Sequence, residues 1–323
     1  MLSTNYVHEA TRRHSHMVRC VVALPDGTFV SASNDHTLKL WQRTTGDSVR
    51  TFEGHADMVL CVVSLPGRIA STSMDRTIKL WGLQDGQCHR TLIGHQGAVM
   101  CALALPDGLI SASDDETLRR WDTTTGLCLM LMRPGYAIDC LALFSDGRVL
   151  LPGEDLNART TLQVWDVAPG AGRCLQTWAA DDVLVNCVAA LPDGRVISGG
   201  WRMLKVWEVT NASCVLTLAG PHSQVLSVAT LPNDTNRVVS SSDDGLKIWR
   251  LTDGACLQAF NGFLSHVHSV IVCFDGRIIA GSADTTIRIY VDKQREAEQR
   301  AVKELCRQRA RCQDLAKVIA GFV

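Results

Sequence analysis

Short β-rich runs of apolar residues recur along the chain, and turn-forming residues separate them. One class of turn contains Asp-Gly, often after Pro, as in Pro25-Asp26-Gly27 and Pro106-Asp107-Gly108. A second class follows an aromatic residue, as at Thr45-Gly46 and Asp85-Gly86. Asp and Gly tolerate the positive φ angles that tight hairpins require. The pattern predicts units of four short strands joined by hairpins.

The runs repeat with a nearly constant period. Aromatic residues recur at intervals of 40, 40, 44, 42, 42 and 41 residues, at Trp41, Trp81, Trp121, Trp165, Trp207, Trp249 and Tyr290. The segment Thr37–Trp41 returns as Thr77–Trp81 and again as Thr117–Trp121. A fixed period of this length indicates a repeat architecture in which each unit packs on its neighbours.

Composition and charge exclude several classes. The chain has 323 residues, with 32 Lys plus Arg and 33 Asp plus Glu, so its net charge is −1. A nucleic-acid-binding domain would usually carry a basic excess. No apolar stretch approaches roughly 18 residues, so we expect no membrane span. The polar N-terminal segment, residues 1–16, lacks an apolar signal-peptide core, so we expect no secretion.

The cysteines follow the repeat. Ten of the 13 fall into two repeating positions: Cys20, Cys61, Cys101, Cys140 and Cys187, then Cys88, Cys128, Cys174, Cys214 and Cys256. We interpret them as small buried hydrophobic residues, too far apart to pair. The other three (Cys273, Cys306, Cys312) form no CxxC motif, so we predict no metal site. Free thiols favour a reducing compartment, the cytoplasm or the nucleus.

The repeated positions resemble the WD-repeat (WD40) family. Its Gly-His and Trp-Asp signatures stand at Gly54-His55, Gly94-His95, Trp121-Asp122 and Trp165-Asp166. The resemblance covers residues 4–291 and implies an all-β fold, a seven-bladed β-propeller. No fourth strand follows Tyr290, so the segment Asn5–Arg13 is expected to complete the last blade and close the ring.

The family carries a structural tetrad of His, Ser, Asp and Trp in each blade. Three units match it in full: His14, Ser31, Asp35, Trp41; His55, Ser71, Asp75, Trp81; and His95, Ser111, Asp115, Trp121. Linked together, these buried polar groups satisfy one another. Later units match less well; we expect His222, Ser240, Asp244 and Trp249 in the sixth, and His266 with Asp284 in the seventh. A Ser-His-Asp set repeated in each blade indicates structure, and no catalytic site is predicted.

The resemblance also implies a partner site on the top face, where each inner strand begins. The predicted partner-binding residues are Met17, Arg19, Met58, Leu60, Met74, Met100, Asp114, Asp139, Glu154, Trp201 and Leu226. Methionines suit adaptable peptide recognition, and the acidic arc favours a partner segment with an apolar stretch followed by Lys or Arg. Alternatively, the methionines plug the channel, the acidic residues are solvated loop charges, and Trp201 fills the space of a missing tetrad.

Residues 292–323 break the repeat and predict one amphipathic helix. One stripe of this helix, apolar except for Gln308, contains Ala301, Leu305, Gln308, Cys312, Leu315, Ile319 and Phe322. The stripe can dock on the propeller, self-associate as a short coiled coil, or bind a partner helix.

We therefore predict a non-enzymatic scaffold or adaptor that binds an unidentified protein or peptide and needs no cofactor. No phosphate-binding loop or His-Glu-x-x-His metal motif supports an enzyme. A ubiquitin-system adaptor and a subunit of an RNA-associated complex remain alternatives. A phosphopeptide receptor would place arginines at the top-face positions, where only Arg19 fits.

Overall fold

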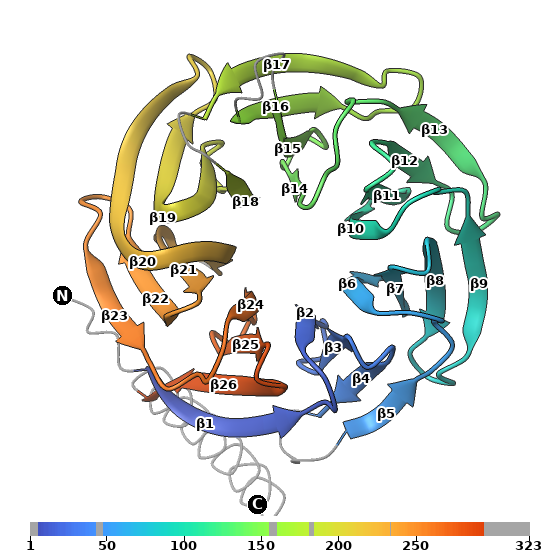
Figure 1. Cartoon of the computed structure of the whole chain (residues 1–323), viewed down its shortest axis with the longest axis horizontal. Helices are drawn as coiled ribbons and strands as arrows, with labels where there is room; N and C mark the ends of the chain where they lie inside the picture. The colour runs from blue at the N-terminus through green and yellow to red at the C-terminus, as the bar shows by residue number, and fades with distance from the viewer. Residues whose placement is uncertain (1–5, 43–47, 155–159, 181–183, 233, 294–323) are drawn as a thin grey trace, which may run out of the picture.

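The computed structural model of the chain describes residues 6–42, 48–154, 160–180, 184–232 and 234–293, with the backbone alone at residues 220–222. Strands β1 to β26 make up the regular structure of these ranges. Figure 1 shows their sheets arranged in a ring around a common centre. The predicted helical tail, beyond Asp292 and Lys293, lies outside the described residues. Among the described residues, no helix has the length and apolar character needed to span a membrane.

Four sheets each consist of four antiparallel strands that are consecutive in the chain. The first contains β2 (Val18–Ala23), β3 (Phe29–Ser33), β4 (Leu38–Trp41) and β5 (Ser48–Phe52), and the second β6 (Val59–Leu65), β7 (Arg68–Ser73), β8 (Thr77–Gly82) and β9 (Cys88–Ile93). The third contains β10 (Val99–Leu105), β11 (Gly108–Ser113), β12 (Leu118–Trp121) and β13 (Cys128–Met132), and the fourth β14 (Ala142–Leu143), β15 (Val149–Glu154), β16 (Thr160–Asp166) and β17 (Arg173–Ala179). In each, the first strand faces the centre of the ring and the last lies at its rim (Figure 1).

Another sheet joins the two ends of the described chain. It runs β1 (Tyr6–Arg13), β26 (Thr286–Asp292), β25 (Ile278–Ser282) and β24 (Val267–Val272). Strand β1 pairs antiparallel with β26, from Tyr6 opposite Asp292 to Arg13 opposite Thr286. The Tyr6 hydroxyl also donates a 2.9 Å hydrogen bond to the carbonyl of Gly276. The N-terminal segment therefore supplies the outer strand of the sheet formed by the end of the repeat region.

The remaining sheet has six strands: β18 (Val185–Ala190), β19 (Val196–Glu208), β20 (Ser213–Leu231), β21 (Asp234–Ser242), β22 (Gly245–Arg250) and β23 (Cys256–Phe260). Strand β19 doubles back on itself. This is shown by the Trp207 indole, which donates a 2.9 Å hydrogen bond to the hydroxyl of Ser198 in the same strand. An extended strand would separate these residues by about 30 Å. Arg202, with φ of 67°, lies between the two arms.

Apolar side chains fill the spaces between neighbouring sheets. One cluster combines Phe52 from the first sheet with Ile69 and Trp81 from the second. Equivalent clusters join the second sheet to the third and the third to the fourth. In the same way, Trp41 of the first sheet packs against Ile287 of β26. Since both faces of each sheet are covered, the second strands, such as β3 and β11, are buried along their whole length.

Candidate functional site

Three predicted tetrads form continuous chains of hydrogen bonds. In the third sheet, the Trp121 indole donates to the Ser111 hydroxyl at 2.8 Å, and Ser111 contacts His95 Nε2 at 2.8 Å. The other ring nitrogen of His95 lies 2.9 Å from Asp115 Oδ2. The first sheet repeats these contacts at 2.7, 2.7 and 2.7 Å, through Trp41, Ser31, His14 and Asp35. The second repeats them at 2.8, 2.7 and 2.6 Å, through Trp81, Ser71, His55 and Asp75.

The network fits a neutral imidazole. Ser111 accepts from the indole, so its own proton is available to His95 Nε2, and Nδ1–H then donates to Asp115. Burial lowers the pKa of His95, which keeps the ring neutral. Burial also opposes ionisation of Asp115, but hydrogen bonds from Thr117, Gln96 and His95 outweigh it and hold its pKa at about 2. The polar groups of the four tetrad side chains thus bond to one another, to the adjacent backbone and to Thr117, which is a structural role.

The fourth sheet replaces the tetrad with different side chains. The register puts Leu151 opposite Gln163, where the first three sheets pair their tetrad Ser with Lys39, Lys79 or Arg119. The Trp165 indole instead donates to Gln163 Oε1 at 2.9 Å. The Tyr136 ring occupies the space beside Gly153: a Cβ atom there would lie 2.4 Å from the Tyr136 hydroxyl. This sheet therefore differs from its neighbours at the end nearest the top face.

The predicted pairing of His266 with Asp284 was wrong. His266 Nδ1 is hydrogen-bonded to Asp243, in the turn between β21 and β22. The Asp284 carboxylate instead accepts hydrogen bonds from the backbone amides of Thr286 and Leu264. The reason is register. Val267 pairs with Ser282 as Val18 pairs with Ser33, so the residue four positions earlier, equivalent to His14, is Phe263.

In the sixth unit of the repeat, the Trp249 indole donates to the Ser240 hydroxyl at 2.8 Å, and the Asp244 amide to Ser242 at 3.2 Å. The side chain of His222 lies outside the described residues.

The interpretation of the repeated cysteines was also wrong in two respects. Those at the start of the rim strands are exposed rather than buried: Cys88, Cys128, Cys174, Cys214 and Cys256. One pair of equivalent inner-strand cysteines, moreover, is not far apart. Cys20 in β2 and Cys61 in β6 have their sulfur atoms 3.9 Å apart. The two inner strands are neighbours around the ring centre, where the sheets converge. Every described cysteine is nevertheless a free thiol. No group of three or more His, Cys, Asp or Glu side chains within the described ranges is arranged to hold a metal ion.

Backbone hydrogen bonds bring several of the predicted partner-binding residues together. The amide of Met74 donates to the carbonyl of Met58 at 3.0 Å, and that of Asp114 to Ala98 at 3.0 Å. The amide of Asn34 donates to Met17 at 2.9 Å. Each bond joins the start of an inner strand to the turn after the second strand. Because all sheets are threaded in the same sense, these residues share one face of the ring, which we call the top face.

Exposure divides the predicted top-face residues. Met17, Met74 and Trp201 are 36%, 42% and 50% exposed. Asp114, Asp139 and Glu154 are exposed as well, whereas a second group is half-buried: Arg19, Met58, Leu60, Met100 and Leu226. Arg19 donates a 2.9 Å hydrogen bond from Nε to Asn34 Oδ1, and burial lowers its pKa.

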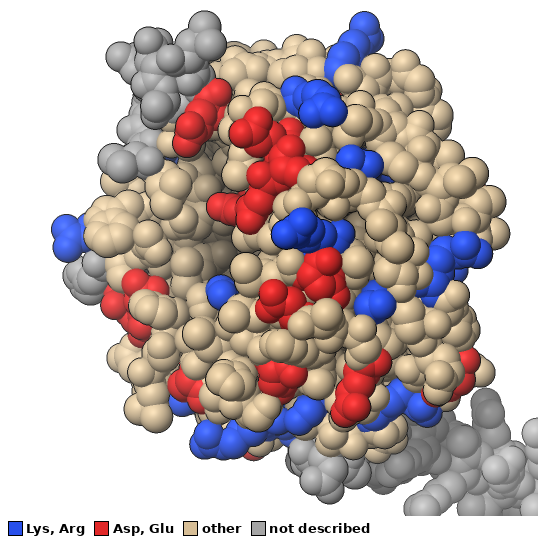
Figure 2. Space-filling model, turned by 45° about the vertical axis from the view of Figure 1, so that its right-hand side comes forward, with Lys and Arg blue, Asp and Glu red and all other residues tan. Residues whose placement is uncertain are grey.

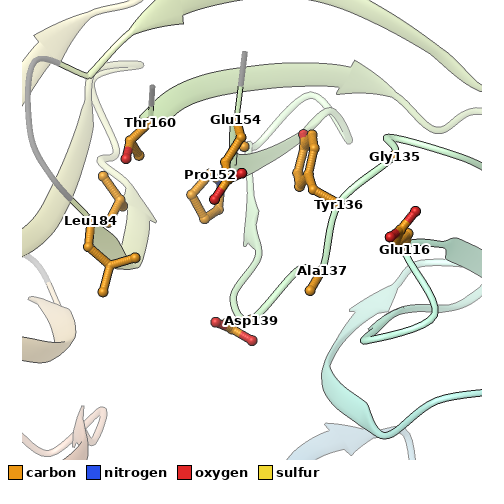
Figure 3. A pocket seen from close by; sticks show the side chains of 11 residues that line it. Glu116, Gly135, Tyr136, Ala137, Asp139, Pro152, Glu154, Thr160 and Leu184 are labelled. Atoms are coloured by element: carbon orange, nitrogen blue, oxygen red, sulfur yellow. The ribbon is translucent and has the colours of Figure 1, made fainter. Parts of the chain in front are cut away.

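A cavity of about 430 Å³ opens beside the fourth sheet. Its carboxylates come from three segments: Glu116 from the turn after β11, Asp139 from the approach to β14, and Glu154 from the end of β15. Figure 3 shows these side chains around the cavity, with Leu184 on the side opposite Glu116. Although the Asp139 side chain is exposed as a whole, partial desolvation of its carboxylate at the cavity wall and the nearby charge of Asp114 raise its pKa. Figure 2 shows acidic side chains gathered beside the central hollow of the ring.

The sequence patterns did not single out Tyr136, Pro152 or Thr160, which also line the cavity. One signal was available: Pro134 stands where the first three units have the tetrad His, and Gly153 where they have the Ser two residues after the tetrad Ser, as at Ser113. The loss of both residues indicated that other side chains fill this region.

Comparison with known proteins identifies the repeat. The sequence model described as "WD domain, G-beta repeat" matches residues 7–42, 46–82, 86–122, 172–208, 212–250 and 254–290. The chain belongs to the WD40 repeat family. The predicted resemblance is thereby confirmed, and the ring of repeated antiparallel sheets is the β-propeller-like fold expected of WD40 repeats. WD40 repeat proteins are generally protein-binding scaffolds rather than enzymes.

A curated relative shares only part of the chain. "Protein DOA1" from Saccharomyces cerevisiae (strain ATCC 204508 / S288c) is 45% identical over 53 residues, which are 16% of this chain and 7% of the relative. The WD40 matches themselves leave out residues 123–171. That segment includes the fourth sheet from β14 to β16 and most of the cavity lining, so the cavity coincides with the divergent repeat.

Proposed function

We propose that this WD40 chain is a non-enzymatic scaffold that binds a segment of a protein partner on the top face of a seven-bladed propeller. One observation carries the proposal: Met17 at the start of an inner strand, and Met74 and Trp201 after the second strands of their units, expose large apolar side chains on one face. Exposed apolar groups at the mouth of a ring cost solvation free energy unless a partner covers them.

Seven blades account for the six-stranded sheet. The first part of β20, residues 213–219, pairs with β19, whereas residues 225–231 pair with β21. Strand β19 itself supplies two antiparallel arms. One four-stranded unit therefore consists of β18, the two arms of β19 and the first part of β20. The other consists of the second part of β20 with β21, β22 and β23. Together with the five other sheets, these two units make seven.

The side chains suit a flexible protein segment. Methionine has three rotatable bonds and a polarisable sulfur, so it adapts to different apolar partners. Tryptophan is enriched among the residues that dominate binding energy at interfaces. Trp201 pairs in the β19–β20 ladder with Gln224, so its backbone is held while half of its surface stays exposed. The free thiols of the described cysteines support a cytoplasmic or nuclear location.

Quantitative affinity purification from cells that express the protein tests the proposal. We compare the wild type with Met17→Glu/Met74→Glu and with a matched control, Leu129→Glu/Leu175→Glu. The control places the same charges at exposed leucines on the rim strands β13 and β17. We expect the top-face variant to lose a discrete set of partners that the rim variant retains. Retention of every partner by a folded top-face variant, judged by circular dichroism, would contradict the proposal.

A further inference from the structure

The cavity beside the fourth sheet concentrates negative charge that the described residues do not balance. Glu116, Asp139 and Glu154 line it, and the described residues of its lining include no Lys or Arg. Within the described ranges, none of these three carboxylates forms an ion pair with a basic side chain. The other acidic residues with basic partners, such as Asp107 with Arg120, lie outside the cavity.

We propose that this cavity binds the side chain of a lysine or arginine from the partner segment. This inference rests on the proposed function, because it assigns the polar half of the same binding site. A cavity of this size falls within the range of about 300–1,000 Å³ that is typical of ligand pockets.

The lining matches both parts of such a side chain. Leu184, Pro152 and Ala137 supply apolar surface for the methylene stem, and the carboxylates surround the space that the cationic group would occupy (Figure 3). Lys and Arg side chains commonly pack their stems on apolar surface while the charged group meets polar partners. Carboxylates from three separate segments suit the several N–H donors of an ammonium or guanidinium group.

Electrostatics favours an occupied cavity. Partial desolvation of its carboxylate and the charge of Asp114 raise the pKa of Asp139, which means that its negative charge is disfavoured in the free protein. A cation placed beside Asp139 removes that cost, whereas an anion would increase it. The site therefore selects a positively charged side chain over a neutral or acidic one of similar size.

The cavity adjoins the apolar part of the top face. The Leu184 carbonyl lies so near Gly200 that a Cβ atom there would be 2.4 Å from it, and Gly200 precedes Trp201. Leu184 and Trp201 are 46% and 50% exposed. A single extended segment can thus place an apolar side chain on Trp201 and a basic one in the cavity.

The divergence of this repeat explains why the cavity exists here. The three units with complete tetrads bind the loop before the inner strand through a His–Asp contact. In the fourth unit Tyr136 fills the space beside Gly153. The loop before β14 accordingly brings Gly135, Ala137 and Asp139 to the wall of the cavity.

A random-peptide phage library screened on the full chain tests the inference. The cavity variant is Asp139→Asn/Glu154→Gln. The control is Glu9→Gln/Glu208→Gln, which changes the net charge equally at residues outside the cavity. We expect wild-type binders to share one Lys or Arg among apolar residues. Its replacement by norleucine should weaken binding to the wild type and the control at least about tenfold, and to the cavity variant much less.

The outcomes separate the two proposals. Binders that share apolar residues but no cationic one, or a norleucine effect of equal size in the wild type and the cavity variant, overturn this inference and leave the proposed function standing. Binders that both Met17→Glu/Met74→Glu and Trp201→Glu retain, or no binders at all, contradict the proposed function and this inference with it. Circular dichroism and thermal melting of each variant establish that binding is measured on folded protein.

Discussion

The sulfur atoms of Cys20 and Cys61 lie 3.9 Å apart, on the inner strands of neighbouring sheets. The Cys61 thiol bonds to Cys20 and lowers the pKa of Cys20, whereas the same contact and burial raise the pKa of Cys61. Arg19 and Leu60 are the adjacent residues in β2 and β6 and belong to the predicted top-face site. The two thiols therefore lie next to residues of the predicted top-face site.

We expect mild oxidation to join Cys20 to Cys61. Hydrogen peroxide accepts two electrons and the two thiol protons and leaves as two waters, while a disulfide of about 2.05 Å forms. Peptide mapping by mass spectrometry without reduction should detect the cross-linked pair, and Cys20→Ser should abolish it. A cross-link that persists in Cys20→Ser, or none in the wild type when exposed Cys88 is oxidised, would contradict the expectation.

Removing a tetrad hydroxyl should destabilise the fold. Ser111→Ala leaves the buried indole N–H of Trp121 and the His95 ring without their partner. An unsatisfied buried polar group costs about 1–3 kcal/mol of unfolding free energy. Denaturant titration measures the loss, and Ser145→Ala, at an exposed turn position, is the control and should change it by under ~0.5 kcal/mol. Equal effects of the two substitutions would refute the tetrad's structural role.

His268 should make stability depend on pH. Burial and the charges of Arg19 and His266, only partly offset by Asp243, lower its pKa from 6.5 to about 4. The unfolded chain therefore binds a proton before the folded chain does, and stability falls as the pH drops from 6.5 towards 4. Since the ring is partly exposed, we expect His268→Gln to reduce this fall by ~1–2 kcal/mol. Denaturant titrations across this range measure it, and an NMR titration of His268 with a midpoint near its ordinary value would disprove the expectation.

Gly153 should resist enlargement. A Cβ atom at this position would lie 2.4 Å from the Tyr136 hydroxyl and 2.5 Å from Cζ of the same ring. Gly153→Ala should therefore cost about 1–3 kcal/mol of unfolding free energy through overpacking. The cost should shrink in a Tyr136→Ala background, where the ring is absent. A double-mutant cycle by denaturant titration measures this coupling, and strictly additive effects would show that the two residues do not compete for space.

Much of the fold follows from local pattern. The hairpin turns and the periodic tryptophans predicted repeated four-stranded units, and these appear as antiparallel sheets whose tryptophans pack between neighbours. Irregular repeats were harder to read. In the seventh unit the repeat pattern predicted His266 at the position of the tetrad His, whereas the strand register places Phe263 there.

The candidate binding site was only partly predictable. Equivalent positions in the repeat identified Met17, Met74 and Trp201, because a side chain's place in one unit recurs in the next. The cavity could not be found in this way, since its carboxylates belong to different segments and its shape depends on how Tyr136 packs. The sequence marked the divergence of the repeat but not the space that it creates.

What the sequence determined by itself is the repeat: strand order, turn positions and the periodic core, all of which depend on contacts between residues close along the chain. The tertiary structure decided which residues from different sheets meet. It brought Cys20 to Cys61, His266 to Asp243, and Glu116, Asp139 and Glu154 to one cavity. The physical reason is that these contacts depend on how the sheets converge around the ring, a geometry set by packing between sheets and absent from the pattern within any one of them.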